Sequence, residues 1–223
     1  MTTGARARTR SSRTTNTRGN DRRVTDLTFV SSNRSKFREV RDVLRPFGVR
    51  VRWARRALPE PQVESLEEVV AAKLDAVRDL PGYVLVEDSG LFIPALAGFP
   101  GVYSAHFLRI WKFGPILELL RHRPRTAHFR TVAGLRNGRR RWMFSGEVPG
   151  RIARRPAGRG GFGYDPIFVP DGWTRTFAEG PRTAKNEISH RARAVRKVGA
   201  LLAAPDPSSG TRAARRRTSR RRA

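Results

Sequence analysis

Two adjacent carboxylates, Glu87 and Asp88, directly follow the strand-forming run Tyr83-Val84-Leu85-Val86. The Ser-Gly pair behind them is typical of a break, so the acids are expected at the open end of a strand, where α/β proteins bind their ligands. Two carboxylates this close both ionise cheaply only where a cation, solvent or hydrogen-bond donors offset their repulsion. The pair therefore indicates a divalent metal site or a perturbed base, unless it is a plain turn in which Glu87 is a solvated charge.

A polar loop, residues 31–36, lies between a short apolar run and a helical pattern. Free N–H groups at a helix start, together with the positive charge of Lys36, would hold an anion such as phosphate. The loop has no glycine, so it is not a Walker loop. An ordinary Ser/Asn helix cap is the alternative interpretation.

Two further stretches could recognise a nucleotide. The segment 158–166 contains four glycines, and its Phe162 and Tyr164 offer flat faces on which a base could stack. Lys185, His190 and Arg191 fall within seven residues and suit phosphate and carbonyl recognition. A simple turn and a solvated helix start are the respective alternatives.

Composition limits the classes to which the chain can belong. At 223 residues and 38% hydrophobic it can bury one sizeable core, and it has no cysteine for disulfides, thiolate chemistry or Cys-ligated zinc. No apolar run is long enough to span a bilayer and no secretory signal is visible, so a cytoplasmic location is expected.

The formal charge of +27 raises the question of nucleic-acid binding. Residues 1–25 and 204–223 each hold seven Arg and one Asp, and only five of the 46 basic residues are Lys. Such a chain-wide preference for Arg argues against selection for one binding face. The two polar, Arg-rich tails are predicted to be disordered, which leaves a single domain at 26–203.

The order of elements predicts an α/β fold. A strand at 27–30, a helix with Phe37 and Val40 on its apolar face, a strand at 49–53, a helix behind the capping box that starts at Ser65, and a strand at 83–87 give β-α-β-α-β. A short helix is expected at 115–120. Alternating runs on both sides of Asn137-Gly138 then predict an antiparallel hairpin, so the sheet should be mixed. A strand at 167–169 and a final helix up to Leu202 complete the pattern.

Together these stretches resemble the non-canonical purine nucleoside triphosphate pyrophosphatases, the inosine triphosphatase or Ham1-like family. The likeness runs in order from about Leu27 to Leu202 and rests on residues 31–36, 86–91, 98–104, 160–168 and 185–191, with Leu58-Pro59-Glu60 as a further element. Where the family usually has Thr-Gly-Asn, this chain has Ser31-Ser32-Asn33, which puts the backbone geometry of the phosphate loop in question.

The resemblance implies an elongated fold around a long, twisted mixed sheet, with a nucleotide cleft between two lobes. It implies hydrolysis of ITP, dITP or XTP to the monophosphate and pyrophosphate, with Mg²⁺, by a homodimer. In that scheme Asp88 is the catalytic residue and a metal ligand, and Glu60 is the second metal carboxylate. The implied substrate-binding residues are Ser31, Ser32, Asn33, Arg34, Ser35, Lys36, Ser89, Phe162, Gly163, Tyr164, Asp165, Lys185, His190 and Arg191.

Two alternatives stay open at this point. One is a nucleic-acid-binding protein that uses its Arg-rich tails, with an incidental or inactive pyrophosphatase core. The other is a nucleotide pyrophosphatase with a different base preference.

Overall fold

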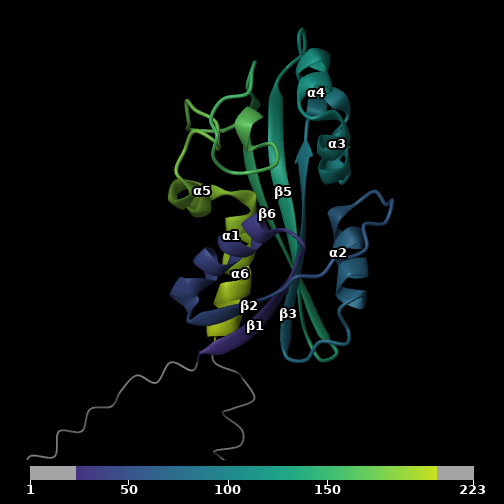
Figure 1. Cartoon of the computed structure of the whole chain (residues 1–223), viewed down its shortest axis with the longest axis vertical. Helices are drawn as coiled ribbons and strands as arrows, with labels where there is room; N and C mark the ends of the chain where they lie inside the picture. Colours follow the sequence, from purple (N-terminus) through teal and green to yellow (C-terminus); the bar gives the residue numbers. More distant parts are fainter. Residues whose placement is uncertain (1–23, 205–223) are drawn as a thin grey trace, which may run out of the picture.

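The computed structural model describes residues 24–204, which form a mixed β-sheet flanked by α-helices (Figure 1). The strand order is β2-β1-β3-β5-β6-β7, with β4 paired to β3. Parallel pairing joins β1 to β2 and β3, whereas β3, β5, β6 and β7 pair antiparallel, so the predicted mixed sheet is confirmed. The strands are β1 (Thr25–Val30), β2 (Val49–Ala54), β3 (Tyr83–Phe92), β4 (Pro100–Gly101), β5 (Thr126–Asn137), β6 (Arg140–Ile152) and β7 (Phe168–Pro170).

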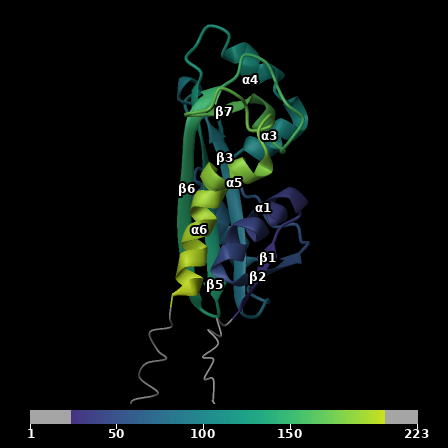
Figure 2. The same cartoon turned by 90° about the vertical axis from the view of Figure 1, so that its left-hand side faces the viewer.

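Helices cover both faces of this sheet. Figure 1 shows α2 on one side of β3 and β5, with α1 and α6 on the other, while α3 and α4 lie at the far end of the molecule from β1 and β2. In Figure 2, α5 leads directly into α6. The helices are α1 (Arg34–Leu44), α2 (Leu66–Asp75), α3 (Ser104–Trp111), α4 (Gly114–Leu119), α5 (Arg182–Ile188) and α6 (His190–Ala203).

The first half of the chain folds in the predicted β-α-β-α-β order because its helix starts are marked by side chains. The Asn33 side chain caps α1, and Ser65 with Glu68 forms the expected capping box of α2. Each cap ends the preceding loop at a defined residue. The helices therefore begin where the sequence indicates and pack back on the parallel strands.

The strand that carries the two acids is longer than predicted. We expected it to end at residue 87, but β3 continues through Ser89 and Gly90 to Phe92. Gly90 is not a turn residue here: a Cβ at this position would overlap the carbonyl oxygen of Gly101, on the paired β4. Its role is to let another backbone approach closely. The carboxylates consequently lie in the middle of a buried strand, not at its open end.

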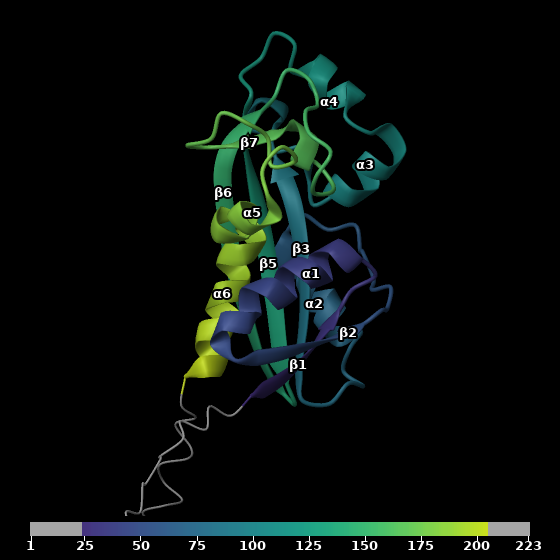
Figure 3. The same cartoon turned by 60° about the vertical axis from the view of Figure 1, so that its left-hand side comes forward.

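The predicted hairpin is confirmed, and it forms the long axis of the molecule. Strands β5 and β6 pair from Thr126 with Arg151 to Asn137 with Arg140, and Gly138 supplies the positive φ of the turn. One apolar cluster lies on each face near β1 and β3. A third includes Phe129 and Phe168 and belongs to the end of the molecule where Figure 3 shows α4 and β7. Strand β5 of the hairpin therefore contributes residues to all three apolar clusters.

The sequence predicted two disordered tails and no membrane-spanning segment. The Arg-rich tails predicted at 1–25 and 204–223 lie almost wholly outside the described residues. Within residues 24–204, no helix combines the length and apolar character that crossing a bilayer requires.

Gly134 on β5 should be essential for seating α2 on the sheet. A Cβ there would lie 2.5 Å from Val70 Cγ1 and 3.0 Å from Leu74 Cδ1. Gly134→Val should therefore lower the free energy of unfolding in urea by about 3 kcal/mol, as overpacking of a core does. The cross-strand neighbour Met143 is exposed, and Met143→Val should change it by less than about 0.5 kcal/mol. Equal effects of the two changes would contradict this account of the packing.

Candidate active site

The loop before α1 is ordered by its own side chains. Asn33 Oδ1 accepts the backbone N–H groups of Ser35 at 2.9 Å and Lys36 at 3.1 Å, and Ser31 Oγ accepts that of Asn33 at 3.1 Å. The expectation that this helix start presents free N–H groups is therefore wrong for these three groups. The Asn33 amide and the Lys36 ammonium are side-chain donors that could meet an anion at this loop, while Arg34 is exposed on the first turn.

Ser32 does not strain this loop. Between residues 24 and 204, positive φ at a non-glycine residue occurs only at Ala97 and Lys112. The exposed Ser32 accordingly has an ordinary backbone conformation, and a glycine is not required at its position.

The two neighbouring acids point to opposite faces of β3, as side chains alternate along a strand. On the α1 and α6 side, Glu87 Oε1 lies 2.6 Å from Lys36 Nζ, and Oε2 lies 3.3 Å from Arg191 Nε. Burial raises the pKa of Glu87, but Arg191 and Lys36 outweigh it and hold that pKa far below its ordinary value. Glu87 is therefore a permanent anion that fixes two cations.

Asp88 faces α2 and is paired with Lys73. Lys73 Nζ lies 2.6 Å from Asp88 Oδ1 and 3.7 Å from Glu60 Oε1, so one ammonium joins the two carboxylates expected to bind metal. Burial raises the pKa of Asp88, against the opposing effect of Lys36 and Lys73. Asp88 Oδ2 makes no hydrogen bond with any of the residues 24–204 and remains available as an acceptor.

Within the described chain, no three His, Asp or Glu side chains gather as a metal site. Asp88 and the exposed Glu60 nevertheless meet the need of Mg²⁺, which commonly uses one or two carboxylates and takes its other ligands from substrate phosphates and water. The donor set therefore fits a magnesium ion that arrives with a phosphate ligand.

A chain of buried ion pairs runs from Glu87 towards the Gly-rich loop. Arg191 Nη1 lies 2.5 Å from Glu39 Oε2, Lys185 Nζ lies 2.9 Å from Glu39 Oε1, and the same Nζ lies 2.6 Å from Asp165 Oδ2. Asp165 Oδ2 also accepts the backbone N–H of Phe162 at 2.8 Å. The position of the loop is thus set by the same network that holds the anion Glu87.

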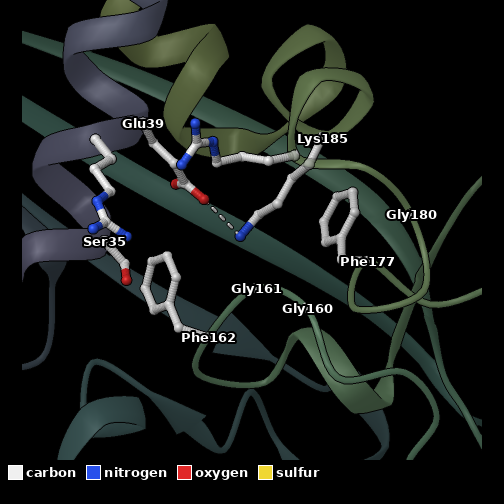
Figure 4. Close-up of a pocket in the computed structure, with 10 residues that line it drawn as sticks. Ser35, Glu39, Gly160, Gly161, Phe162, Phe177, Gly180 and Lys185 are labelled. Carbon is white, nitrogen blue, oxygen red and sulfur yellow. Dashed lines mark ion pairs between the residues drawn. The ribbon is translucent and has the colours of Figure 1, made fainter.

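A cavity of about 270 Å³ opens above this network (Figure 4). The Phe162 ring borders it, with Lys185 Nζ 4.6 Å and Arg191 Cζ 5.4 Å from the ring centroid. An aromatic face beside cationic donors suits a planar, polar heterocycle such as a nucleobase. The lining residues are Ser35, Arg38, Glu39, Gly160, Gly161, Phe162, Phe177, Gly180, Arg182 and Lys185.

The hydroxyl of Ser89 is fully engaged inside the protein. It donates to Glu87 Oε2 at 2.8 Å, lies 2.6 Å from Thr131 Oγ1, and accepts from Arg191 Nη2 at 3.1 Å. A hydroxyl has one donor and two acceptor sites, so none is left for a ligand. Ser89 orders the ion pairs and does not itself offer a contact to a substrate.

Several residues predicted to bind substrate do not line the cavity. Tyr164 is 4% exposed in the apolar core and donates its hydroxyl to Ser104 O at 2.9 Å, so its ring is not available for stacking on a base. Asp165 is 2% exposed and is not part of the cavity lining, and Gly163 supplies a positive φ in the loop. His190 is buried against Phe129, and burial together with Arg191 lowers its pKa well below the ordinary value.

Sequence reasoning missed Glu39 and Lys73. Each lies on an otherwise apolar helix face: Glu39 precedes Val40 on α1, and Lys73 lies one turn after Val69 on α2. A single charge on a buried face is a readable signal, because burying it unpaired is costly. The sequence does not show which oppositely charged side chains pair with Glu39 and Lys73.

Comparison with known proteins extends this picture. A sequence model of the Ham1 family matches residues 27–201. The chain is 47% identical over 179 residues to a dITP/XTP pyrophosphatase of Thermococcus kodakarensis, covering 79% of this chain and 96% of the relative. A dITP/XTP pyrophosphatase of Pyrococcus horikoshii is 41% identical over 170 residues, covering 75% and 91%. The structure of a HAM1 protein from Coxiella burnetii aligns with TM-score 0.69 and 30% identity, covering 80% and 98%.

Glu39 should be a costly carboxylate to neutralise, because it balances both Lys185 and Arg191. Glu39→Gln should lower the free energy of unfolding at neutral pH by about 3 kcal/mol, since it leaves buried charge unpaired. Burial raises the pKa of Glu39, but Arg191 and Lys185 lower it below the ordinary value. The difference in unfolding free energy between Glu39→Gln and wild type should therefore have its full size above about pH 4.3, the ordinary pKa of a glutamate. It should shrink as the pH falls through the lower pKa that Glu39 has in the folded protein.

The matched control is Glu118→Gln, because Glu118 is exposed and, among residues 24–204, pairs only with the exposed Arg121. It should change stability by less than about 0.5 kcal/mol in the same urea titrations. A Glu39→Gln protein as stable as this control would show that the buried network does not depend on the carboxylate.

Proposed function

The chain belongs to the Ham1 family, and on that premise we propose that it hydrolyses the non-canonical purine nucleoside triphosphates dITP, ITP and XTP to the monophosphate and pyrophosphate, in the cytoplasm. The observation that carries the proposal is the continuous network from Lys36 through Glu87, Arg191 and Glu39 to Lys185. This network connects the α1 loop, where phosphates would bind, to the cavity beside Lys185, where a base would bind. A nucleoside triphosphate needs both kinds of site.

The triphosphate lies between the α1 loop and β3 in this proposal. Lys36 and the Asn33 amide hold phosphate oxygens, and Lys36 keeps its orientation through Glu87. Asp88 and Glu60 would hold a magnesium ion, which when bound neutralises developing charge on the phosphate oxygens. This arrangement makes the pyrophosphate a better leaving group.

Asp88 orients the attacking water and accepts its proton. Lys73 holds Oδ1, so the carboxylate cannot rotate freely and Oδ2 is left to contact the water. A carboxylate that also holds a metal ion stays a weak base, so its main contribution is to orient this water. Lys73 is thus a positioning residue for the base.

The base lies on Phe162 in the cavity. Lys185 has three N–H donors, of which Glu39 and Asp165 take two. The third is free for O6 of hypoxanthine or xanthine, which is an acceptor. Adenine presents an amino donor at the same place, so Lys185 disfavours it.

The proposed assembly is a homodimer. An apolar surface along α3 supports this, because Trp111 at 59% and Ile110 at 52% exposure lie at its end, and Tyr103 at 44% exposure lies just before its start. Grouped exposed apolar side chains are typical of contact surfaces. Tyr103 also donates to the carbonyl of Val63 at 3.4 Å, in the segment that carries Glu60, so a partner seated here would steady one of the proposed metal ligands.

The activity is tested by measuring pyrophosphate release from dITP, XTP, dATP and dGTP with Mg²⁺. Release from dITP and XTP should be faster than from dATP by about two orders of magnitude or more, as expected where a buried donor meets the wrong edge of a base. Asp88→Asn should keep the fold at reduced stability, because Lys73 loses its buried partner, and should lower turnover by about three orders of magnitude, while Asp75→Asn on the exposed end of α2 should match wild type. Equal rates on all four substrates, or a fully active Asp88→Asn enzyme, would refute the proposal.

The dimer is tested by light scattering after size-exclusion chromatography. Wild-type protein should have twice the mass of one chain, and Trp111→Glu should have the mass of one chain, because it places a charge in an apolar contact. Met143→Glu, at an exposed apolar residue on β6, should remain dimeric. A dimeric Trp111→Glu protein would place the contact elsewhere.

A further inference from the structure

A second hollow, of about 570 Å³, lies on the outer side of α1, away from Asp88. It is bounded by α1, by the short helix η1 (Arg45–Phe47), and by α5 and α6. Its residues include Arg41, Arg45, Arg182, Arg196, Phe47 and Asn186. We call this hollow the arginine groove.

The groove has more cations than anions. Asp42 is shared by Arg41 at 3.0 Å and Arg182 at 3.3 Å, and the remaining carboxylate on the lining belongs to Glu187. Arg196 donates instead to the carbonyls of Glu187 at 2.7 Å and Asn186 at 2.8 Å. Within residues 24–204, Arg45 and Arg196 take part in no ion pair, so no carboxylate of this part of the chain balances their charge.

A row of four arginines lies along one side of α1 and reaches the groove. Arg34, Arg38, Arg41 and Arg45 follow at intervals of three or four residues and are all exposed. The row leads from the mouth of the base cavity, where Arg38 and Arg182 lie, to the arginine groove.

The groove also contains an unsatisfied acceptor. Asn186 Oδ1 is buried and has no hydrogen-bond partner within the described part of the chain. An inorganic anion cannot satisfy it, because it needs an N–H or O–H donor. Pro46 and Phe47 add apolar surface beside it.

We propose that the arginine groove is a second binding site, which takes a nucleoside monophosphate. Guanidinium groups bind phosphate through paired N–H donors, and a sugar hydroxyl or a base amino group supplies the donor that Asn186 lacks. The volume falls in the range of sites for ligands of this size. The short α5 presents Arg182 and Asn186 to the groove and Lys185 to the base cavity, so a ligand held in the groove fixes the helix that positions Lys185.

The experiment is equilibrium dialysis with AMP as the probe. Arg45→Glu should weaken AMP binding by about tenfold or more, because it reverses one unbalanced charge. Arg140→Glu, at the exposed hairpin turn, is the matched control and should bind like wild type. Lys36→Ala should also keep AMP binding, since Lys36 lies in the triphosphate site. Thermal unfolding of each variant checks that it is folded.

Two further measurements test the identity of the ligand. AMP should bind more tightly than inorganic phosphate or adenosine alone, and Asn186→Ala should reduce the affinity for AMP towards that for phosphate. Unchanged AMP binding in Arg45→Glu overturns the proposal, and so does its loss in Lys36→Ala. Equal affinities for phosphate and AMP overturn it as well, because a plain anion site would remain.

Discussion

The alternation of side chains along β3 is the constraint on which the site depends. Glu87 and Asp88 are adjacent in the chain, but a strand directs them to opposite faces of the sheet. Each acid is buried, and a buried anion requires its own cation. Lys36 from α1 satisfies one and Lys73 from α2 satisfies the other, so the helices on the two faces are joined through two consecutive residues.

On the α1 face the pairing does not stop at one partner. Arg191 contacts Glu87 and Glu39, and Lys185 contacts Glu39 and Asp165, so cations and anions alternate from α1 to the Gly-rich loop. Such buried pairs add little net stability, but the loss of one member is expensive because it leaves its neighbour unpaired. Their value lies in fixing side-chain positions. The fully engaged hydroxyl of Ser89 serves the same purpose.

Sequence patterns were sufficient for most of the fold. The caps at Asn33 and Ser65, the apolar periodicity of the helices and the Asn137-Gly138 turn are local signals, and the elements they predict are present. The end of β3 was misjudged because Gly90 is required by a distant backbone, which no local pattern records. For the same reason the partners of Glu39 could not be named, and Tyr164 was expected in the base site although its hydroxyl bonds inside the core.

The ion-pair network around the site has no excess of positive members. It joins four cations, Lys36, Lys73, Lys185 and Arg191, to five anions, Glu39, Glu60, Glu87, Asp88 and Asp165. A nucleoside triphosphate that enters such an array meets no net positive potential from it. These ion pairs fix the positions of the side chains in the site. The positive charge that neutralises the triphosphate must therefore enter together with the substrate. A nucleotide already complexed with its cation is thus the form that this site can accommodate without breaking its own pairs.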